Sequence, residues 1–423
     1  MTMSIISLIC LVAVIVIAIW KQYNLGFLAI AMTLVLCIIS GTPTNRMLNN
    51  FDGTMFARMA FGAAAFGALR VTGAAPLLIK KIMKKFGNSF IPFMPWFFFL
   101  LSFIPGMLGM GSIATAAIVS TGAIVGIQLG IYPLLIPLMI MVVASVNPVH
   151  PLQMVGIMVT DIITPLGYGT AEITTAFYSE MILVFIVCLA LYIIFKGYKV
   201  DKSVKLDFDE DLPKFDKKQL VTLFGSVAII AGIVFFKYDI GLMGAFICIV
   251  YFLFDVYNEK TIFQQMPLNV MFTVAGVGVL VSLVVQLGGI ELVMQILNPI
   301  LNKWTLVPIV ALVAGLLSWL SSTVGVVIPT LTPLLPGLIA TSGANISFAT
   351  VLTAMLMAGH VASCNPFDGT GGTIVTYVTP ILETEEQRKK VIPHLLVISS
   401  CLILAVVLLS ATGIIQMVVS LVS

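Results

Sequence analysis

Serine and asparagine recur at the same spacing in two apolar segments of this chain. Residues 138–151 read LMIMVVASVNPVHP, and residues 356–369 read LMAGHVASCNPFDG. The polar residues that align are Ser145 with Ser363 and Asn147 with Asn365. Each asparagine precedes a proline, which lacks an N–H and disfavours helical geometry in the residue before it. Each segment is therefore predicted to be a helix that breaks at its asparagine.

Such breaks offer two kinds of binding group. The N-terminus of the half-helix after a break carries partial positive charge and favours a carboxylate. Hydroxyl, amide and exposed carbonyl oxygens suit a small cation such as sodium. Unwound backbone is tolerated inside a membrane only where it is buried in protein or lines a cavity. Two matching breaks therefore predict a transport site for an organic anion and a cation.

The composition indicates a membrane protein. Of 423 residues, 60% are hydrophobic and 9% are charged, which excludes an ordinary soluble domain. Residues 3–20 lack a basic segment and a clear cleavage site, so they are interpreted as a retained first helix. The net charge of +3 gives no indication of nucleic-acid binding, since membrane orientation accounts for the basic residues. The six cysteines show no disulfide framework or metal cluster.

The apolar runs predict one helical plan that occurs twice, on either side of a charged linker. The first half has helices at about 3–20, 25–40, 55–79 and 181–195, with hairpin arms at 90–108 and 116–129. The second has helices at about 220–236, 240–254, 270–286 and 391–419, with hairpin arms at 307–320 and 324–339. We therefore expect an all-α polytopic membrane protein with two repeats of five transmembrane helices, each repeat containing one re-entrant hairpin and one broken helix.

The predicted units are a first repeat at 1–195, a cytoplasmic linker at 196–218 and a second repeat at 219–423. Most of the 21 lysines and arginines lie in connecting segments that would all fall on one side of the membrane, at 21, 80–85, 196–218, 260 and 388–390. The connecting segments on the other side carry few basic residues. The positive-inside rule then predicts that both termini lie outside. An odd number of crossings in each repeat makes the two repeats inverted, an arrangement typical of secondary transporters. We expect the bacterial inner membrane.

The predicted site combines the hairpin tips with the helix breaks. Expected substrate contacts are Ser112, Thr115, Asn147, Ser321, Ser322, Thr323, Asn365 and Thr370. Expected sodium ligands are Ser112, Ser145, Asn147, Ser322, Ser363, Asn365 and Asp368. Small polar residues also serve membrane helices in packing and kinks, but their repetition in matching places favours a site. No other cofactor is expected.

Four ionisable residues have two interpretations each. His150 and His360 flank the breaks and could relay protons, or could simply hydrogen-bond to the backbone. Asp368 could bind a cation or carry a proton, or could cap the following half-helix. Arg70, inside an apolar run, could attract an anion, although pairing with a scaffold group or snorkelling is favoured. Asp161 and Glu172 are interpreted as marking a membrane edge.

The order of hairpin, broken helix, linker, hairpin and broken helix resembles the ion transporter superfamily, specifically the divalent anion and sodium symporters. The segment YNLGFLA at 23–29 is similar to dicarboxylate carriers associated with malonate uptake. That family typically has Ser-Asn-Thr at both hairpin tips, where this chain has SIA at 112–114 and SST at 321–323.

The resemblance implies a dimeric elevator, in which a scaffold stays fixed while the hairpins and broken helices slide with the substrate. The scaffold would be residues 1–80 and 219–290, and the moving part residues 89–195 and 304–423. The implied partners are a small organic anion, a coupling ion, membrane lipid and a second copy of the chain.

We therefore expect a sodium-coupled importer of a small dicarboxylate such as malonate, malate or succinate. A proton-coupled carrier using Asp368 or His360 stays open, as does the large membrane subunit of a binding-protein-dependent (tripartite) transporter. A membrane enzyme is not expected, because no HExxH, CxxC or GxSxG occurs beside a plausible base. A channel is disfavoured, because inverted re-entrant loops fit alternating access better than a continuous pore.

Overall fold

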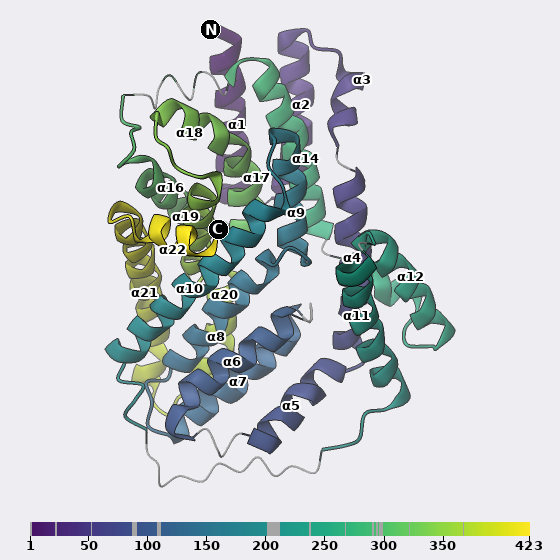
Figure 1. Ribbon diagram of the computed structural model, residues 1–423, viewed down its shortest axis with the longest axis vertical. Helices are drawn as coiled ribbons and strands as arrows, with labels where there is room; N and C mark the ends of the chain where they lie inside the picture. The colour runs from purple at the N-terminus through teal and green to yellow at the C-terminus, as the bar shows by residue number, and fades with distance from the viewer. Residues whose placement is uncertain are drawn as a thin grey trace.

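The regular elements of the protein are helices throughout the part of the chain that the structure describes (Figure 1). The structure is a computed structural model and describes the chain except residues 1, 22, 52, 87–90, 108–110, 201–211, 237, 267, 290–291, 293–294, 296–298, 321 and 367. Within these described residues, three helical segments are long and apolar enough to cross a membrane, namely Thr170–Ile194, Thr323–Ser342 and Glu385–Ala411. Further apolar helices are shorter, which fits a chain built from half-helices and hairpin arms. The predicted all-α architecture is confirmed.

Six helices form two small groups, and each group takes one helix from the other half of the chain. The first group contains α1 (Thr2–Lys21), α2 (Leu25–Ser40) and α14 (Leu268–Gln286). The second contains α4 (Gly53–Val71), α11 (Lys217–Phe236) and α12 (Ile240–Leu253). Each group has its own hydrophobic core. Figure 1 shows the two groups at separate places along the molecule.

Most of the remaining helices share one large hydrophobic core. From the first half they are α6 (Met94–Met107), α7 (Gly111–Gln128), α8 (Leu135–Val146), α9 (Met154–Ile163) and α10 (Thr170–Ile194). From the second half they are α16 (Leu306–Leu320), α17 (Ile328–Leu331), α18 (Leu335–Ser342), α19 (Phe348–Ala362), α20 (Gly369–Val378), α21 (Glu385–Ala411) and α22 (Ile414–Val422). Helix α5 (Ala74–Phe86) packs against α4, α7 and α11. The short helices α3 (Thr44–Met47) and α13 (Glu259–Gln265) lie beside the small groups.

Equivalent contacts recur in the two halves at an offset of 215 residues. Asn24 caps α2 and donates from Nδ2 to Thr273 Oγ1 of α14 at 3.0 Å. Asp239 caps α12 and accepts from Arg58 Nε of α4 at 2.7 Å. Adding 215 to Asn24 and Arg58 gives Asp239 and Thr273, so the two crossings are built at matching positions.

The same offset relates the starts of α10 and α21. The backbone N–H of Gly169 donates to Glu172 at 2.8 Å, and that of Thr384 donates to Gln387 at 3.2 Å. Both are capping-box contacts, in which a side chain three residues on satisfies an orphan backbone donor. The last long helix of each half thus begins with the same capping contact.

Three expected boundaries are wrong. The helix expected at 181–195 begins at Thr170, because Glu172 caps it there, so Glu180 lies inside the helix. The helix expected at 391–419 is two helices, since Gly413 adopts a left-handed φ of 76° between α21 and α22. The helix expected at 55–79 is also two helices, because Gly73 adopts a left-handed φ of 73° between α4 and α5.

Candidate functional site

Both asparagine positions lie at helix breaks, as predicted. Helix α8 ends at Val146, the short helix η3 covers Asn147–Val149, and α9 follows at an angle of 45°. In the second half, α19 ends at Ala362 and α20 begins at Gly369. Both asparagines are buried, at 1% and 2% exposed. The two breaks are therefore interior features of the large core.

Each asparagine connects its break to the first hairpin arm of the same half. Asn147 Nδ2 donates to the carbonyl of Ser102 in α6 at 2.9 Å. Asn365 Nδ2 donates to the carbonyl of Trp319 in α16 at 2.6 Å. A buried amide that satisfies a carbonyl on a neighbouring helix fixes the break against its hairpin. The repeated asparagine thus has the same structural role twice.

A glycine in the first turn of each following half-helix allows close approach to the break. A Cβ on Gly156 would lie 2.2 Å from the His150 carbonyl oxygen, and one on Gly371 would lie 2.1 Å from that of Asn365. Neither distance is compatible with a side chain. The half-helix N-termini therefore rest directly on break carbonyls.

The oxygens at the breaks differ in what they contact. Ser145 Oγ donates to the Val142 carbonyl at 2.8 Å, and Ser363 Oγ donates to the His360 carbonyl at 2.7 Å. These hydroxyl protons are directed into their own helices, which leaves the oxygen lone pairs outward. Asn147 Oδ1 is buried without a hydrogen-bond partner among the described residues. A buried amide oxygen in that condition is a suitable ligand for a cation.

The second hairpin tip packs on the second broken helix. Thr323 Oγ1 lies 2.7 Å from Ser318 Oγ, which donates to the Gly359 carbonyl at 2.9 Å. Ser322 Oγ accepts the backbone N–H of Gly325 at 3.2 Å and caps a π-helical turn. The structure therefore gives Ser322 and Thr323 roles in the hairpin itself.

The remaining predicted contacts divide between described and undescribed positions. Thr115 is buried in α7, at 8% exposed. Ser112 lies in the first turn of α7, but its side chain is outside the described part, and so is residue Ser321. The side chain of Arg70 is likewise outside it. Of the first hairpin tip, the structure thus describes only the backbone from Gly111 to Ala114 and the Thr115 side chain.

Asp368 caps α20, the role proposed as the alternative to ion binding. Its Oδ1 accepts the backbone N–H of Thr370 at 3.0 Å. Thr370 is consequently held beside Asp368, and both are half-buried. A carboxylate at a helix N-terminus is favoured by the helix dipole. The second break therefore already contains one fixed negative group, whereas the first break has none at its cap.

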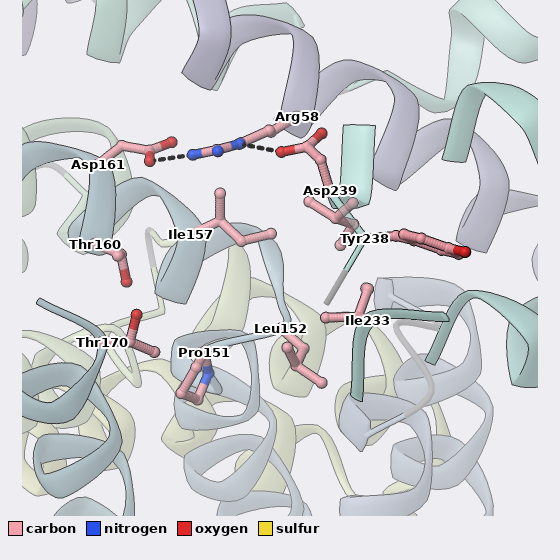
Figure 2. Close-up of a pocket in the computed structure, with 11 residues that line it drawn as sticks. Arg58, Pro151, Leu152, Ile157, Thr160, Asp161, Thr170, Ile233, Tyr238 and Asp239 are labelled. Carbon is pink, nitrogen blue, oxygen red and sulfur yellow. Dashed lines mark hydrogen bonds and ion pairs between the residues drawn. The ribbon is translucent and has the colours of Figure 1, made fainter. Parts of the chain in front are cut away.

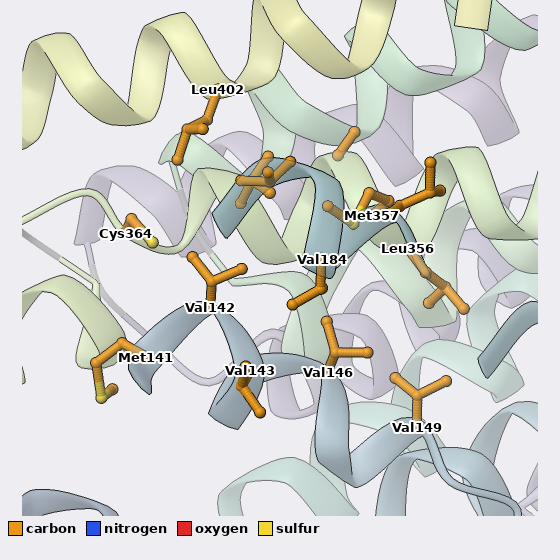
Figure 3. Packing of buried hydrophobic residues seen from close by; sticks show 14 of the residues in the cluster. Met141, Val142, Val143, Val146, Val149, Val184, Leu356, Met357, Cys364 and Leu402 are labelled. Atoms are coloured by element: carbon orange, nitrogen blue, oxygen red, sulfur yellow. The ribbon is translucent and has the colours of Figure 1, made fainter. Parts of the chain in front are cut away.

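The two breaks belong to one assembly. Helix α20 packs against both α7 and α8, and α19 packs against α8 and α10. Figure 3 shows Val142 and Val146 of α8 beside Val184 of α10 and Met357 of α19, with Cys364 at the second break nearby. Helices of the two halves therefore pack together near the breaks.

A buried acid–imidazole pair lies next to the second break, and sequence reasoning missed it. Glu180 Oε1 and His360 Nδ1 are 2.9 Å apart, with side chains 0% and 2% exposed. The bond joins α10 to α19. His360 was expected to bond to backbone or relay a proton, whereas Glu180 was placed outside its helix. A lone acidic residue followed by an apolar run was the signal that could have found it.

His150 forms the backbone contact that was considered for it. Its Nδ1 accepts the N–H of Leu152 at 3.2 Å, and its ring packs edge-on against Phe177 with centroids 5.1 Å apart. Glu172 belongs to the cap of α10 and not to a binding site. These two residues are thus explained by local structure.

A cavity of about 290 Å³ lies between the first break and the helix group of α4, α11 and α12. Arg58 of α4 contacts Asp161 of α9 at 2.5 Å and Asp239 at 2.7 Å (Figure 2). Pro151 and Leu152, from the loop after the first break, line the same cavity. One guanidinium against two carboxylates leaves a net negative charge, so this cavity does not suit an organic anion. Asp161 was expected to mark a membrane edge and instead links two helix groups.

The fold is that of a membrane transporter. The solved structure of the YdaH transporter from Alcanivorax borkumensis matches with a TM-score of 0.55 and 14% identity, covering 87% of each chain. At that identity the similarity concerns the fold alone.

Residues 1–148 match the family described as "Dicarboxylate carrier protein MatC N-terminus". The resemblance to dicarboxylate carriers inferred from the sequence is therefore confirmed for this part of the chain. No curated protein sequence matches. Both similarities are to transport proteins, and the apolar composition is that of an integral membrane protein.

Proposed function

We propose that the protein imports a small dicarboxylate, such as malonate, malate or succinate, together with sodium. The observation that carries the proposal is the pair of asparagine-anchored helix breaks, which lie in one core and each connect to a hairpin arm. The match of residues 1–148 with a dicarboxylate carrier family supports the substrate class. No other cofactor is invoked.

The substrate site lies where the half-helices α9 and α20 begin. Their first turns carry the positive end of the helix dipole, which suits carboxylate oxygens. Hydroxyls and amides at the tips and breaks complete the site, namely Ser112, Thr115, Asn147, Ser321, Ser322, Thr323, Asn365 and Thr370. Two half-helix N-termini fit the two ends of a dicarboxylate better than a monocarboxylate.

Sodium binds on the other side of the breaks, where α8 and α19 end in carbonyl groups. Asn147 Oδ1 supports this site, because it is a buried oxygen without a partner among the described residues. The remaining proposed ligands are Ser112, Ser145, Ser322, Ser363, Asn365 and Asp368. Neutral oxygens predominate in this set, which favours sodium over a divalent cation, whose sites contain more carboxylates.

Transport proceeds by an elevator movement of inverted repeats. The recurring contacts at an offset of 215 residues support a repeat at 1–195 and another at 219–423. The two small helix groups correspond to the scaffold, residues 1–80 and 219–290. The large core corresponds to the moving part, residues 89–195 and 304–423. A homodimer in the inner membrane, with both termini outside, completes the proposal.

Ligand-dependent thermal stability tests this function on the purified protein. Ligands that bind the folded state raise its stability by mass action, about 2.7 kcal/mol at 100 times the dissociation constant. We expect malonate, malate or succinate to raise the melting temperature in sodium and not in choline. Equal stabilisation in choline contradicts sodium coupling. If no anion acts, the partner-dependent (tripartite) subunit becomes the better account.

A further inference from the structure

The buried pair of Glu180 and His360 has no role in the proposed sodium cycle. It lies inside the large core, between α10 and α19, and both helices belong to the proposed moving part. His360 is one turn before the second break, because Ser363 bonds to its carbonyl. If the proposed moving part shifts as a rigid unit, Glu180 and His360 move together and stay in contact.

The fold does not require this pair. In the aligned segments His360 stands opposite Val142, and the offset of 215 residues places Leu395 of α21 opposite Glu180. Both counterparts are apolar and fully buried. The two equivalent positions, one in each half, are therefore packed without ionisable groups, so the Glu180–His360 pair provides something other than packing.

The pair is also poorly suited to a purely structural role. Glu180 Oε2 and His360 Nε2 are buried and have no hydrogen-bond partner among the described residues. A buried ion pair repays the cost of desolvation only when its remaining polar atoms are satisfied, and apolar residues of similar size are often more stabilising. A partly satisfied pair that persists inside a membrane is by default a functional feature.

The surroundings of Glu180 contain few other charges. Of the helices packed on α10, the fully described α8 and α22 contain no titratable side chain, and Asp161 of α9 is bound to Arg58. His150 faces Phe177, one turn from Glu180. Around His360, α16 and α18 contain no titratable residues in their described parts, and α21 carries its charges in its first turns. The remaining nearby groups are Cys188, Cys364 and Asp368.

We propose that the Glu180 carboxyl, hydrogen-bonded to His360, is a proton-binding site that is loaded and emptied in each transport cycle. The inference rests on the proposed transport function and adds a second coupling ion to it. One proton from water on the loading side converts carboxylate plus neutral imidazole, with net charge −1, into a neutral pair. The same proton returns to water on the other side, so no group is consumed.

Charge explains why the proton would accompany the substrate. A net negative pair next to Asp368 opposes the entry of a dianion at the second break, because like charges repel strongly in a medium of low dielectric constant. Neutralising the pair removes one of these charges before the substrate binds. Proton loading and anion binding therefore favour each other, and this coupling is reciprocal.

The test measures anion and proton movement in the same vesicles. The protein is reconstituted into liposomes that contain a pH-sensitive dye, and radiolabelled succinate, malonate or malate is added outside with sodium. The wild type is expected to take up label and to acidify the lumen. Glu180→Gln and His360→Gln are expected to lose the acidification per labelled molecule, while Glu172→Gln, on the same helix, keeps it.

The outcomes separate this inference from the function on which it rests. Uptake of label by the wild type without acidification, or equal acidification by Glu180→Gln, overturns the proton site and leaves the transporter intact. Absence of labelled uptake for all three dicarboxylates overturns both proposals. Protein-free liposomes give the background for permeation of the protonated acid.

A measurement on the wild type alone applies if the variants do not fold. Calorimetric titration with succinate is repeated in two buffers with different ionisation enthalpies, between about pH 6 and about pH 8. Proton uptake on binding makes the observed heat depend on the buffer, which is the expected result. A heat that does not depend on the buffer across this range overturns the inference.

Discussion

The two helix breaks share their anchoring and differ in their charges. At both, an asparagine amide donates to a hairpin-arm carbonyl, and a glycine in the next half-helix lies against a break carbonyl. Among the described residues, an ion pair, that of Asp161 with Arg58, ties the half-helix after the first break to a helix group. A buried acid–imidazole pair lies beside the second break.

This comparison separates the features that form the two breaks from the charged features that distinguish them. The shared features are neutral and local, so both halves need them to form a break at all. The charged features occur once each, in places where the other half has Val142, Thr273 or Thr376. Asymmetry of this kind gives two otherwise similar halves different energies in the two states of a transport cycle. Four mutational tests follow, ordered by expected effect.

Gly156→Ala and Gly371→Ala should have the largest effect, and the effect should be equal at the two breaks. A Cβ would overlap a carbonyl oxygen at either position, and overpacking typically costs about 1–3 kcal/mol or more. Melting temperature and the yield of monodisperse protein measure this. Gly278→Ala in α14 is the control, because a Cβ there meets nothing within 4 Å. If alanine at either position leaves stability unchanged, close contact between the half-helix and the break carbonyl is not a requirement shared by the two breaks.

Asn147→Ala and Asn365→Ala should cost similar stability, and both should weaken sodium binding because both side chains are proposed sodium ligands. Each leaves a buried carbonyl without its donor, for about 1–3 kcal/mol. Asn147→Ala also removes the buried Oδ1 proposed to bind sodium, so the sodium concentration for half-maximal stabilisation should rise about tenfold, equivalent to about 1.4 kcal/mol. Thermal shift against sodium at fixed succinate measures both. An unchanged sodium dependence for Asn147→Ala contradicts the cation assignment.

Asp161→Asn should loosen the first break without unfolding the protein. Asp161 and Arg58 are partly exposed, at 12% and 32%, so the stability cost should stay within about 1 kcal/mol. Backbone amides at 154–166 should exchange hydrogen faster, as measured by mass spectrometry, while those at 369–381 stay unchanged. The exposed Asp255→Asn is the control. Identical exchange in both half-helices would show that the ion pair does not distinguish the breaks.

Glu386→Gln should have the smallest effect, which is seen at neutral pH and disappears at low pH. The Lys390 ammonium, 2.5 Å away, holds the pKa of the Glu386 carboxyl below its usual value. The lowered pKa means that the contact stabilises the folded state at neutral pH and is lost as pH falls through that pKa. Melting temperatures of variant and wild type should therefore converge in acid. A difference that grows on acidification would contradict the sign.

Local chemistry made the breaks predictable from sequence. Asn147 and Asn365 each precede a proline in an apolar run, and that pattern determines backbone geometry without knowledge of neighbours. The cap at Asp368 was similarly within reach, since a carboxylate before a glycine-rich turn commonly caps a helix.

Long-range pairing was not predictable in the same way. Arg58 meets residues 103 and 181 positions away in the chain, and Glu180 meets a partner 180 positions away. The spacing of apolar residues along the chain contains no information about such long-range pairs. Glu180 was also misplaced, because the apolar run predicts a helix that begins at 181. The helix in fact begins at Thr170, where Glu172 caps it.

Uptake of labelled malonate, malate and succinate into liposomes tests the central claim most directly. With an inward sodium gradient and equal pH on both sides, the account predicts accumulation of at least one dicarboxylate above its external concentration. Replacing sodium by choline should abolish accumulation. Accumulation that persists in choline, or uptake that only equilibrates in sodium, would contradict a sodium-coupled carrier built on the two helix breaks.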